Sequence, residues 1–523
     1  MTPSTAPQAF EVAARRFASR TAVISETGES WTYAQLAARR MQAARALIAC
    51  GVQPGDRVAI WAQNCEEWIV AGLAAHAVGA VLVPINTRMK GEEAGYILAR
   101  SRARVLFSSG FFLGQHYPGI LGHHRPKTLE AHIVLRDAQP GDHTWEQFLA
   151  RGDPIAEDRV RARDATIEPD SPMDIMFTSG TTGQPKGVVT GHAQNLKAIA
   201  EWSHKMGLVE HDRYLVANPF FHTFGYKVGW LGGLLAGLAV MPHAVFDAAA
   251  ILRRISQERV TVLPGPPTLF ISLLGDPARA SADLSSLRAT ITGAATIAPA
   301  LIERIRSQLG FRIVLTGYGL TETCGIVSLA DAQDSAETIA TTCGKAIADT
   351  EVRCVDAVGE PVPAGESGEI VVRGYNVMQG YFEDERATAE AIDGDGWLHT
   401  GDVGTIDALG NLRITDRLKD MYIAGGFNCY PAEIERMMAA HPGIAQVAVV
   451  GVPDERLGEV GKAFVVPRPG QEVDEAELIA WCRDKMANYK VPRFVEWVAG
   501  LPTNSSGKVL KYQLRERSKR GAA

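Results

Sequence analysis

Cysteine is scarce in this 523-residue chain, and the few cysteines present do not form a recognisable site. Only seven occur, an odd number, and no two of them stand in the Cys-x-x-Cys spacing that is typical of zinc sites. We therefore expect neither a disulfide framework nor a structural zinc ion. This pattern fits a reduced, cytoplasmic protein.

Long hydrophobic runs are also missing. The longest apolar stretch, residues 229–241, is too short and too rich in glycine for a membrane-spanning helix. At the N-terminus, Glu11, Arg15 and Arg16 interrupt residues 1–17, so no apolar core of signal-peptide length is present. The sequence therefore predicts no transmembrane segment and a cytoplasmic location.

An excess of positive charge is absent as well. Lys and Arg total 53 against 59 Asp and Glu, which gives a net charge of −6 and a pI near 6.1. Such a charge argues against a nucleic-acid partner. The basic cluster at residues 511–520 is more simply explained as a solvated terminal helix.

The chain does contain the alternating pattern of an α/β protein. Its length exceeds what one hydrophobic core supports, so two or more domains are expected. Short apolar runs alternate with helical patterns over residues 21–150, which predicts sheets covered by helices. Residues 352–373 change to short β runs separated by turns, which predicts a small β subdomain. The stretch after residue 420 suits a small α+β domain.

Local signals place individual elements. Thr32 to Gln35 is a capping box that opens a helix, and Asn64 is expected to cap the next helix. The remaining signals predict strands at 57–62, 80–85, 259–263, 289–292, 311–315 and 446–452, and helices at 431–440 and 475–486.

Residues 177–187 read Phe-Thr-Ser-Gly-Thr-Thr-Gly-Gln-Pro-Lys-Gly. The glycines let the backbone turn its N–H groups toward an anion, and the hydroxyls and Lys186 add side-chain donors. No Ser or Thr follows Lys186, so this is not a Walker A loop. A flexible surface turn is the alternative, but the order of residues favours a phosphate-binding loop.

Three later segments offer further candidates. Residues 218–227 surround His222 with aromatic side chains, although a single His among apolar residues is usually a core residue. The turn at 293–295 consists of small residues after a strand, where a ligand can approach the backbone. Tyr318, between two glycines, can expose its ring to a base, and Glu322 can bind magnesium. A glycine-rich turn with a solvated glutamate is the alternative for this last segment.

Polar residues follow toward the C-terminus. Asp402 comes after a tight turn, where its carboxylate could accept hydrogen bonds from ribose hydroxyls, although a plain turn would look the same. The charged residues 416–420 precede Gly425 and Gly426 and suggest a linker. Residues 501–508 form a second loop of hydroxyls and glycine, which carries Lys508.

Together these motifs resemble the adenylate-forming superfamily, which includes acyl-CoA synthetases, firefly luciferase and peptide-synthetase adenylation domains. The resemblance covers nearly the whole chain and preserves the order of the motifs. It implies an N-terminal domain at 1–415, a hinge at 416–420 and a mobile C-terminal lid at 421–523. It also implies that a carboxylic acid reacts with ATP and Mg²⁺ to give acyl-AMP and pyrophosphate, after which the thiol of coenzyme A displaces AMP.

The resemblance also implies roles for individual residues. Lys508, Glu322, His222, Thr181 and Lys186 would be catalytic, with Glu322 as the metal ligand. Lys419 would be the hinge. The acyl pocket would contain His222, Phe224, Lys227, Val228 and Gly319. The nucleotide and CoA would contact Thr178, Ser179, Gly180, Thr181, Thr182, Gly183, Lys186, Gly293, Ala294, Ala295, Tyr318, Gly319, Thr321, Glu322, Asp402, Arg417, Lys419, Gly425, Gly426 and Lys508.

A few positions depart from the superfamily pattern. Asp416 and Phe427 stand where glycine and glutamate are frequent, and Ala346 stands where proline is usual. With residues 218–227, 261–268, 340–344 and 416–430, the chain looks most like actinobacterial ligases that activate the hexahydroindane propanoate of steroid degradation. Lys227 could then donate to a ketone of a fused-ring keto acid, although a lysine that reaches solvent is the alternative.

Other functions stay open at this stage. The runner-up substrates are medium- or long-chain fatty acids and aryl acids. The enzyme could instead load a separate carrier protein, act as a luciferase-like oxygenase, or be a binding homologue without catalysis. The last is disfavoured because Lys186, Glu322, Asp402 and Lys508 are all present. A homodimer is common among relatives of this kind.

Overall fold

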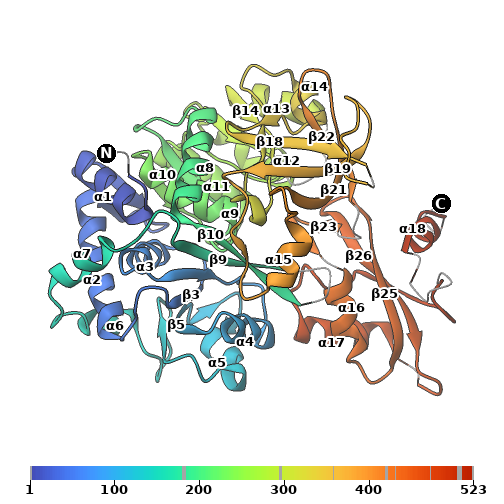
Figure 1. Ribbon diagram of the computed structural model, residues 1–523, viewed down its shortest axis with the longest axis horizontal. Helices are drawn as coiled ribbons and strands as arrows, with labels where there is room; N and C mark the ends of the chain where they lie inside the picture. The colour runs from blue at the N-terminus through green and yellow to red at the C-terminus, as the bar shows by residue number, and fades with distance from the viewer. Residues whose placement is uncertain are drawn as a thin grey trace.

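The computed structural model describes residues 3–179, 184–293, 297, 299–356, 358–417, 422–429, 431–471, 473–502, 509 and 511–520. It has a mixed α/β architecture, in which a large N-terminal part is joined by a smaller C-terminal part (Figure 1). This confirms the predicted fold class. No helix within these residues is long and apolar enough to cross a membrane.

The largest sheet has seven strands in the order β20-β10-β9-β4-β3-β5-β8. Val58 and Ile60 of β3 face one hydrophobic cluster, and Ala59 and Trp61 face another, because successive side chains alternate across a strand. Helices α2 and α3 contribute to the first cluster, and α4 and α5 to the second. Helices therefore cover both faces, as predicted.

The bounds of this sheet and its helices follow the sequence prediction closely. The strands are β3 (Arg57–Trp61), β4 (Val81–Pro84), β5 (Ala103–Ser108), β8 (Ala131–Val134), β9 (Pro172–Ser179), β10 (Pro185–Gly191) and β20 (Gly380–Tyr381). The helices are α1 (Ala6–Arg16), α2 (Tyr33–Ala49), α3 (Glu66–Ala77), α4 (Gly91–Arg100), α5 (Tyr117–Leu121), α6 (Trp145–Ala150) and α7 (Glu157–Asp164).

A second group of strands builds the other half of the N-terminal part. One sheet has the order β11-β12-β1-β2, and β13 pairs in parallel with β14. The strands are β1 (Thr21–Ile24), β2 (Ser30–Thr32), β11 (Arg213–Val216), β12 (Ala239–Pro242), β13 (Ala289–Ile291) and β14 (Ile313–Leu315). The helices are α8 (His192–Lys205), α9 (Thr223–Gly225), α10 (Gly232–Leu235), α11 (Ala248–Glu258), α12 (Pro267–Gly275), α13 (Pro299–Leu309) and α14 (Ala336–Thr341).

Two local predictions are wrong. The strand expected at 259–263 is reduced to Val262, which bridges Tyr214 and Ala289. Asn64 does not cap α3, whose N-cap is Cys65. The Asn64 amide instead donates to three backbone carbonyls, at 2.9–3.1 Å, and its Oδ1 accepts from the Phe220 N–H at 2.8 Å. The Thr32 capping box, by contrast, is confirmed.

The predicted β subdomain is present as an antiparallel sheet in the order β18-β19-β21-β22. A smaller sheet, β15-β16-β17, precedes it along the chain. The strands are β15 (Gly317–Tyr318), β16 (Ser328–Leu329), β17 (Lys345–Ala346), β18 (Thr350–Val355), β19 (Gly368–Gly374), β21 (Leu398–Ile406) and β22 (Leu412–Arg417), with helix α15 at Glu385–Ala391.

The C-terminal part is one sheet with helices on both faces (Figure 1). Helices α16 and α17 pack in one hydrophobic cluster, and Leu514 of α18 packs in another on the opposite face. The strands are β23 (Tyr422–Ala424), β24 (Phe427–Cys429), β25 (Ile444–Asp454), β26 (Gly458–Pro467) and β27 (Phe494–Trp497). The helices are α16 (Pro431–Ala439), α17 (Glu475–Lys485) and α18 (Lys511–Arg520). The division at 415 and 421 stays a prediction.

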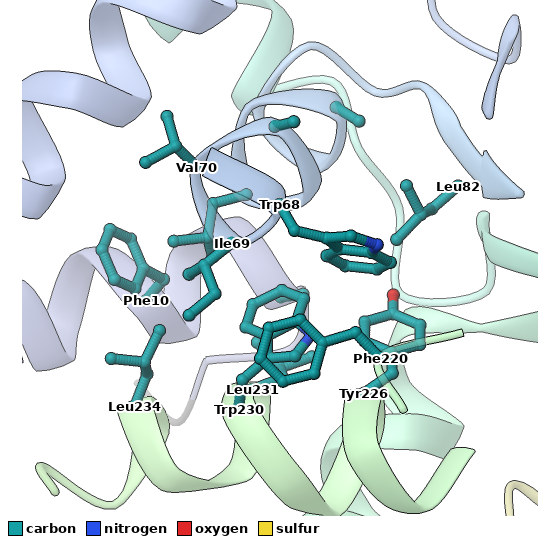
Figure 2. Packing of buried hydrophobic residues seen from close by; sticks show 14 of the residues in the cluster. Phe10, Trp68, Ile69, Val70, Leu82, Phe220, Tyr226, Trp230, Leu231 and Leu234 are labelled. Carbon is teal, nitrogen blue, oxygen red and sulfur yellow. The ribbon is translucent and has the colours of Figure 1, made fainter. Parts of the chain in front are cut away.

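An aromatic cluster fixes the segment after β11 onto helix α3. Figure 2 shows Trp68 of α3 facing Phe220, Tyr226 and Trp230. The ring centroids of Trp68 lie 5.6 Å from those of both Phe220 and Trp230. All four side chains are fully buried. This packing holds the backbone that carries His222.

Candidate active site

Strands β9 and β10 form the hairpin that carries the predicted phosphate loop. Thr178 and Lys186 are cross-strand partners, so the two ends of the loop lie side by side. The strands thus extend into the segment that we expected to be a loop. Gly187 is needed here because an added Cβ would lie 2.7 Å from Cγ2 of Ile175. The loop residues Gly180, Thr181, Thr182 and Gly183, and the Ser179 side chain, lie outside the described structure.

Glu322 lies beside this hairpin, in the 3-10 turn Thr321–Thr323. Its Oε1 accepts hydrogen bonds from the Tyr381 hydroxyl at 3.0 Å and from the Thr178 hydroxyl at 3.4 Å. Burial raises the pKa of Glu322, and the Asp402 charge adds to this, whereas the hydrogen bonds from Tyr381 and Thr178 lower it. Thr178 at the end of the hairpin and the predicted metal ligand are therefore neighbours.

Sequence reasoning missed Tyr381. This residue lies in β20, which pairs with β10, and its ring centroid is 5.0 Å from Nζ of Lys186. Its hydroxyl reaches Glu322, so one side chain contacts both charged groups of the site. The only signal in the sequence was an aromatic residue after a glycine, which is too common to be informative.

Glu322, the predicted magnesium ligand, would need further oxygen atoms from a substrate to bind the ion. Among the described residues, no group of three or more His, Cys, Asp or Glu side chains is arranged to hold a metal ion. Magnesium commonly binds to one or two carboxylates and completes its shell with water and phosphate oxygens. One half-buried carboxylate beside the predicted phosphate hairpin fits that mode of binding.

Asp402 and Tyr318, each predicted to contact the nucleotide, lie beside each other. The Tyr318 hydroxyl donates to Oδ2 of Asp402 at 2.7 Å, and both side chains are buried. Asp402 is also the cross-strand partner of Arg417, whose side chain is outside the described structure. The expectation of an exposed Tyr318 ring is wrong, because only 8% of this residue is exposed.

Backbone segments lie close together near Tyr318, and at Gly319 they leave no space for a side chain. A Cβ on Gly319 would collide with the carbonyl of Gly325, and one on Gly293 would lie 3.4 Å from the carbonyl oxygen of Gly317. The turn at Gly293 and the Tyr318 strand therefore run close together. Ala294 and Ala295 lie outside the described structure.

His222 caps the short helix α9. Its Nδ1 accepts a hydrogen bond from the Phe224 N–H at 3.2 Å. The His222 ring is exposed to solvent, and desolvation by the protein around it lowers its pKa. Even a fully hydrated imidazole, with a pKa near 6.5, would be mostly neutral at pH 7. We therefore take His222 as neutral.

The His222 segment packs against the segment that follows Glu322. A Cβ on Gly325 would lie 3.0 Å from Cβ of Thr223. Phe224 packs edge-on against Trp202 with ring centroids 5.3 Å apart, and Val228 is buried. His222 and Glu322 are thus held on adjoining segments.

Lys227 neither reaches solvent nor has a free ammonium group for a substrate ketone, the two alternatives that the sequence suggested. Only 1% of its side chain is exposed, so it does not reach solvent. Its Nζ lies 3.2 Å from Oδ1 of Asp174 and donates to the Thr190 hydroxyl at 2.9 Å. Asp174 and Thr190 already bind this ammonium ion, so we do not assign it to a substrate ketone.

The described residues of the C-terminal part contact the N-terminal part at several places, two of which bear on the site. Gly425 and Gly426 have φ angles of +57° and +84° and form the turn between β23 and β24, beside Pro266. Lys490 binds Glu93 of α4 at 2.7 Å and Glu433 of α16 at 2.6 Å, a bridge that sequence reasoning missed. Lys419 and Lys508 lie outside the described structure.

Comparison with protein families gives two matches. Residues 10–382 match the family described as AMP-binding enzyme, and residues 433–508 match the AMP-binding enzyme C-terminal domain. Together the two matches span most of the chain.

Two curated relatives are similar over nearly their whole length. A 7a-methyl-1,5-dioxo-octahydro-1H-inden-4-yl propanoyl:CoA ligase of Mycobacterium tuberculosis is 51% identical over 512 residues, 98% of each chain. The ligase with the same name from Rhodococcus jostii is 47% identical and covers 99% of each chain. A feruloyl-CoA synthase of Amycolatopsis is 39% identical over 96% of this chain and 97% of its own length.

Solved structures share the fold. The amide bond synthetase McbA of Marinactinospora thermotolerans superposes with a TM-score of 0.84 at 27% identity, and 98% of this chain and 99% of the other are covered. The o-succinylbenzoate CoA synthetase of Bacillus subtilis gives a TM-score of 0.80 at 29% identity, with 97% and 98% covered.

Proposed function

Since this chain belongs to the AMP-binding enzyme family and is an AMP-forming acid–CoA ligase, we propose that its acid is a fused-ring keto-propanoate from steroid degradation. The observation that carries this proposal is the full-length similarity to two ligases named for such an acid. The family and reaction class expected from the sequence motifs are confirmed.

In the first step we propose that the substrate carboxylate oxygen attacks the α-phosphorus of ATP, and that pyrophosphate leaves. Thr178 and Lys186, side by side at the ends of the loop, would hold the departing phosphates together with Ser179 to Gly183. Lys508 would act at the α-phosphate, where a cation at about 4 Å and an effective dielectric near 20 contributes on the order of 4 kcal/mol.

We propose Glu322 as a ligand of Mg²⁺. When bound, the ion would neutralise phosphate charge. Burial makes an uncompensated carboxylate unfavourable, as the raised pKa of Glu322 reflects, and a cation would relieve that cost. Tyr381 and Thr178 would keep the carboxylate oriented through their hydrogen bonds.

The remaining nucleotide contacts are also proposals. Asp402 and Arg417, which face each other across β21 and β22, would bind the ribose. Thr321 would contact the phosphates. Tyr318, Gly319 and the turn Gly293 to Ala295 would border the adenine, where closely spaced backbone supports the assignment.

In the second step the CoA sulfur attacks the acyl carbon, the bond to the AMP oxygen breaks, and AMP leaves. We propose that Lys419 is the hinge and that the thiol passes Gly425 and Gly426, whose turn lies beside Pro266. Neutral His222 would border the carboxylate, with Phe224, Val228 and Gly319 along the acyl group. The cytoplasmic location and the homodimer stay predictions.

The test is release of AMP and pyrophosphate with a panel of acids, with and without CoA. We expect release that depends on the acid, is completed by CoA, and is fastest with the fused-ring keto acid. A medium- or long-chain fatty acid or an aryl acid as the best substrate would correct the proposed acid. Release indifferent to CoA would favour transfer to a carrier protein.

A further inference from the structure

Lys227 joins two structural units that the reaction must align. It lies in the π-helical turn η2 (Tyr226–Leu231), shortly after His222 on the acyl side of the site. Its Nζ contacts Asp174 of β9 and Thr190 of β10, the two strands of the phosphate hairpin. Asp174 and Thr190 are cross-strand partners, so one ammonium binds both strands at the same level.

The hydrogen bonds around Lys227 use the Thr190 hydroxyl completely. This hydroxyl donates to Oδ1 of Asp174 at 2.8 Å and accepts from Nζ of Lys227 and, at 3.0 Å, from the amide of Asn195. A hydroxyl has one hydrogen and two lone pairs, so no other arrangement satisfies all three neighbours. The network therefore fixes a register between η2, the hairpin and helix α8.

The network is fully desolvated. Asp174, Thr190 and Asn195 are 0% exposed and Lys227 is 1% exposed. Apolar residues of similar volume often stabilise a protein as well as a buried ion pair does, or better, so stability alone does not explain a charge here. Buried polar groups serve in some proteins to specify one alignment among several.

The preceding residue of η2, Tyr226, is anchored to helix α3. The Tyr226 hydroxyl shares a 2.8 Å hydrogen bond with Nε2 of His76 in α3, and Trp230 stacks on Tyr226 within the aromatic cluster of Figure 2. A π-helical turn is rare and often marks a functional site. Lys227 therefore connects an already anchored acyl-side turn to the phosphate hairpin.

The pair also lies close to the Glu322 segment. The charges of Lys227 and Asp174 both act on the thiol of Cys324, which is buried just after Glu322. Along β9, Thr178 lies four positions after Asp174, a distance of about 13 Å. The ion pair is thus set back along the strand from Thr178, which we assign to the phosphates.

We propose that Lys227 and Asp174 form a positioning pair that sets the acyl pocket at the correct separation from the phosphate hairpin for adenylation. The proposal rests on the acid–CoA ligase function given above. A misplacement of about 1 Å at a reacting centre can cost on the order of 100-fold in rate. The pair would act through His222 on one side and through Thr178 and Lys186 on the other.

The experiment measures acid-dependent ATP–pyrophosphate exchange for Lys227→Met, Lys227→Arg and the double variant Lys227→Met/Asp174→Leu. Two acids are used, the fused-ring keto acid and the same acid with methylenes in place of its ketones. We expect Lys227→Met to lower kcat on the order of 100-fold for both acids alike, with a smaller change in KM for ATP. Lys227→Arg should recover part of the loss, and CoA transfer from supplied acyl-adenylate should be largely retained.

The double variant separates positioning from folding. We expect its Tm to equal or exceed that of the wild type, while its kcat stays low. Recovery of both Tm and kcat would show that the pair is merely structural, and a loss confined to the keto acid would show that Lys227 binds a ketone. Lys197→Met, which removes an exposed ion pair with Asp349, is the matched control and should change neither quantity.

Failure of the proposed substrate gives a different result. The wild type would then activate neither of the two acids, and the same variants would be compared with whichever acid of the panel it does activate. If the double variant loses kcat and keeps its Tm with that acid, the result again supports a positioning role for Lys227 and Asp174. Wild-type kcat in Lys227→Met overturns it with any acid.

Discussion

Lys227 and Lys490 are both buried beside carboxylates, yet they join different parts of the molecule. Lys227, 1% exposed, binds Asp174 and Thr190, and all three belong to the N-terminal part. Lys490, 2% exposed, binds Glu433 in the C-terminal part and Glu93 in the N-terminal part. Removing either charge would leave a buried carboxylate unpaired, but only the Lys490 contact would break if the two parts turned relative to each other.

The surroundings of the two lysines reflect this difference. Asn195 of α8 completes the Lys227 network inside one unit. At the junction, the Asn86 amide donates to the Tyr489 hydroxyl at 3.0 Å, beside Lys490. Burial alone would lower the pKa of Lys490, but Glu93 and Glu433 outweigh burial and raise it well above its ordinary value. The ammonium therefore stays charged and holds both parts together at neutral pH.

The arrangement in which Lys490 binds Glu93 bears on which of the two reaction steps the structure represents. Val509 packs in the hydrophobic cluster that contains Leu514 of α18, on the face of the C-terminal sheet away from the N-terminal part (Figure 1). We proposed above that the C-terminal part turns about a hinge at Lys419 between the two steps. Such a turn would separate Lys490 from Glu93. The docked arrangement then suits the CoA step.

The largest expected effect is on the rate of adenylation, and it compares a lysine of the C-terminal part, Lys508, with a lysine of the hairpin, Lys186. We expect Lys508→Ala to slow single-turnover adenylation by a factor on the order of 100 or more, because its charge is needed at the transition state. Lys186→Ala should cost less, since the hairpin holds the departing pyrophosphate. Quenched-flow measurement of acyl-AMP decides the ranking, and the reverse order would mean that the two lysines are assigned wrongly.

A smaller effect is expected from Glu93→Gln, which removes the charge on one side of the junction only. CoA transfer from supplied acyl-adenylate should slow on the order of tenfold, which corresponds to about 1.4 kcal/mol. Adenylation should be unchanged, because the contact is broken in that step. The exposed neighbour Glu92→Gln is the control. Equal slowing of both steps would mean that the Lys490–Glu93 contact, like the Lys227–Asp174 pair, is kept in both steps.

The smallest effect concerns a carboxylate without a lysine. Among the described residues no ammonium or guanidinium binds Glu322, unlike Asp174, Glu93 and Glu433, and its pKa is raised by burial. A raised folded-state pKa means that stability is present below the unfolded pKa and is lost as pH rises through the folded pKa. Glu322→Gln should therefore stabilise the ligand-free protein by about 1 kcal/mol at pH 7.5.

Urea unfolding at two pH values tests this expectation. The stabilisation by Glu322→Gln should largely fade near pH 4, where most wild-type carboxyls are protonated in the folded and in the unfolded chain. A gain that is equal at both pH values would mean that the ionised carboxylate carries no cost in the folded protein.

Local patterns predicted the elements but not their long-range partners. The Thr32 capping box, the strand at Arg57 and the helix at Pro431 depend on residues close in sequence, and all three are present. Asn64 satisfies the capping preference equally well, yet distant carbonyls bind its amide instead. Periodicity reports which side of an element is buried and does not report which distant group it meets.

The same limit applies to the site. The order of the motifs sufficed to predict that Thr178, Lys186, Glu322 and Asp402 lie near one another. The partners of Lys227 and Lys490, and the contact of Tyr381 with Glu322, depend on chain segments far apart in sequence. A lysine in an apolar segment gives no indication of which carboxylate neutralises it. That choice is made by the packing of the sheet and its helices.

The central claim, a ligase for fused-ring keto-propanoates, is tested most directly by competition. An equimolar mixture of the fused-ring keto acid, ferulate and a fatty acid of similar size is supplied with ATP and CoA, and mass spectrometry measures the initial acyl-CoA products. The account predicts that the fused-ring acyl-CoA exceeds each of the others by at least about tenfold, as a pocket shaped for one acid requires. Predominance of feruloyl-CoA or of the fatty acyl-CoA would contradict it.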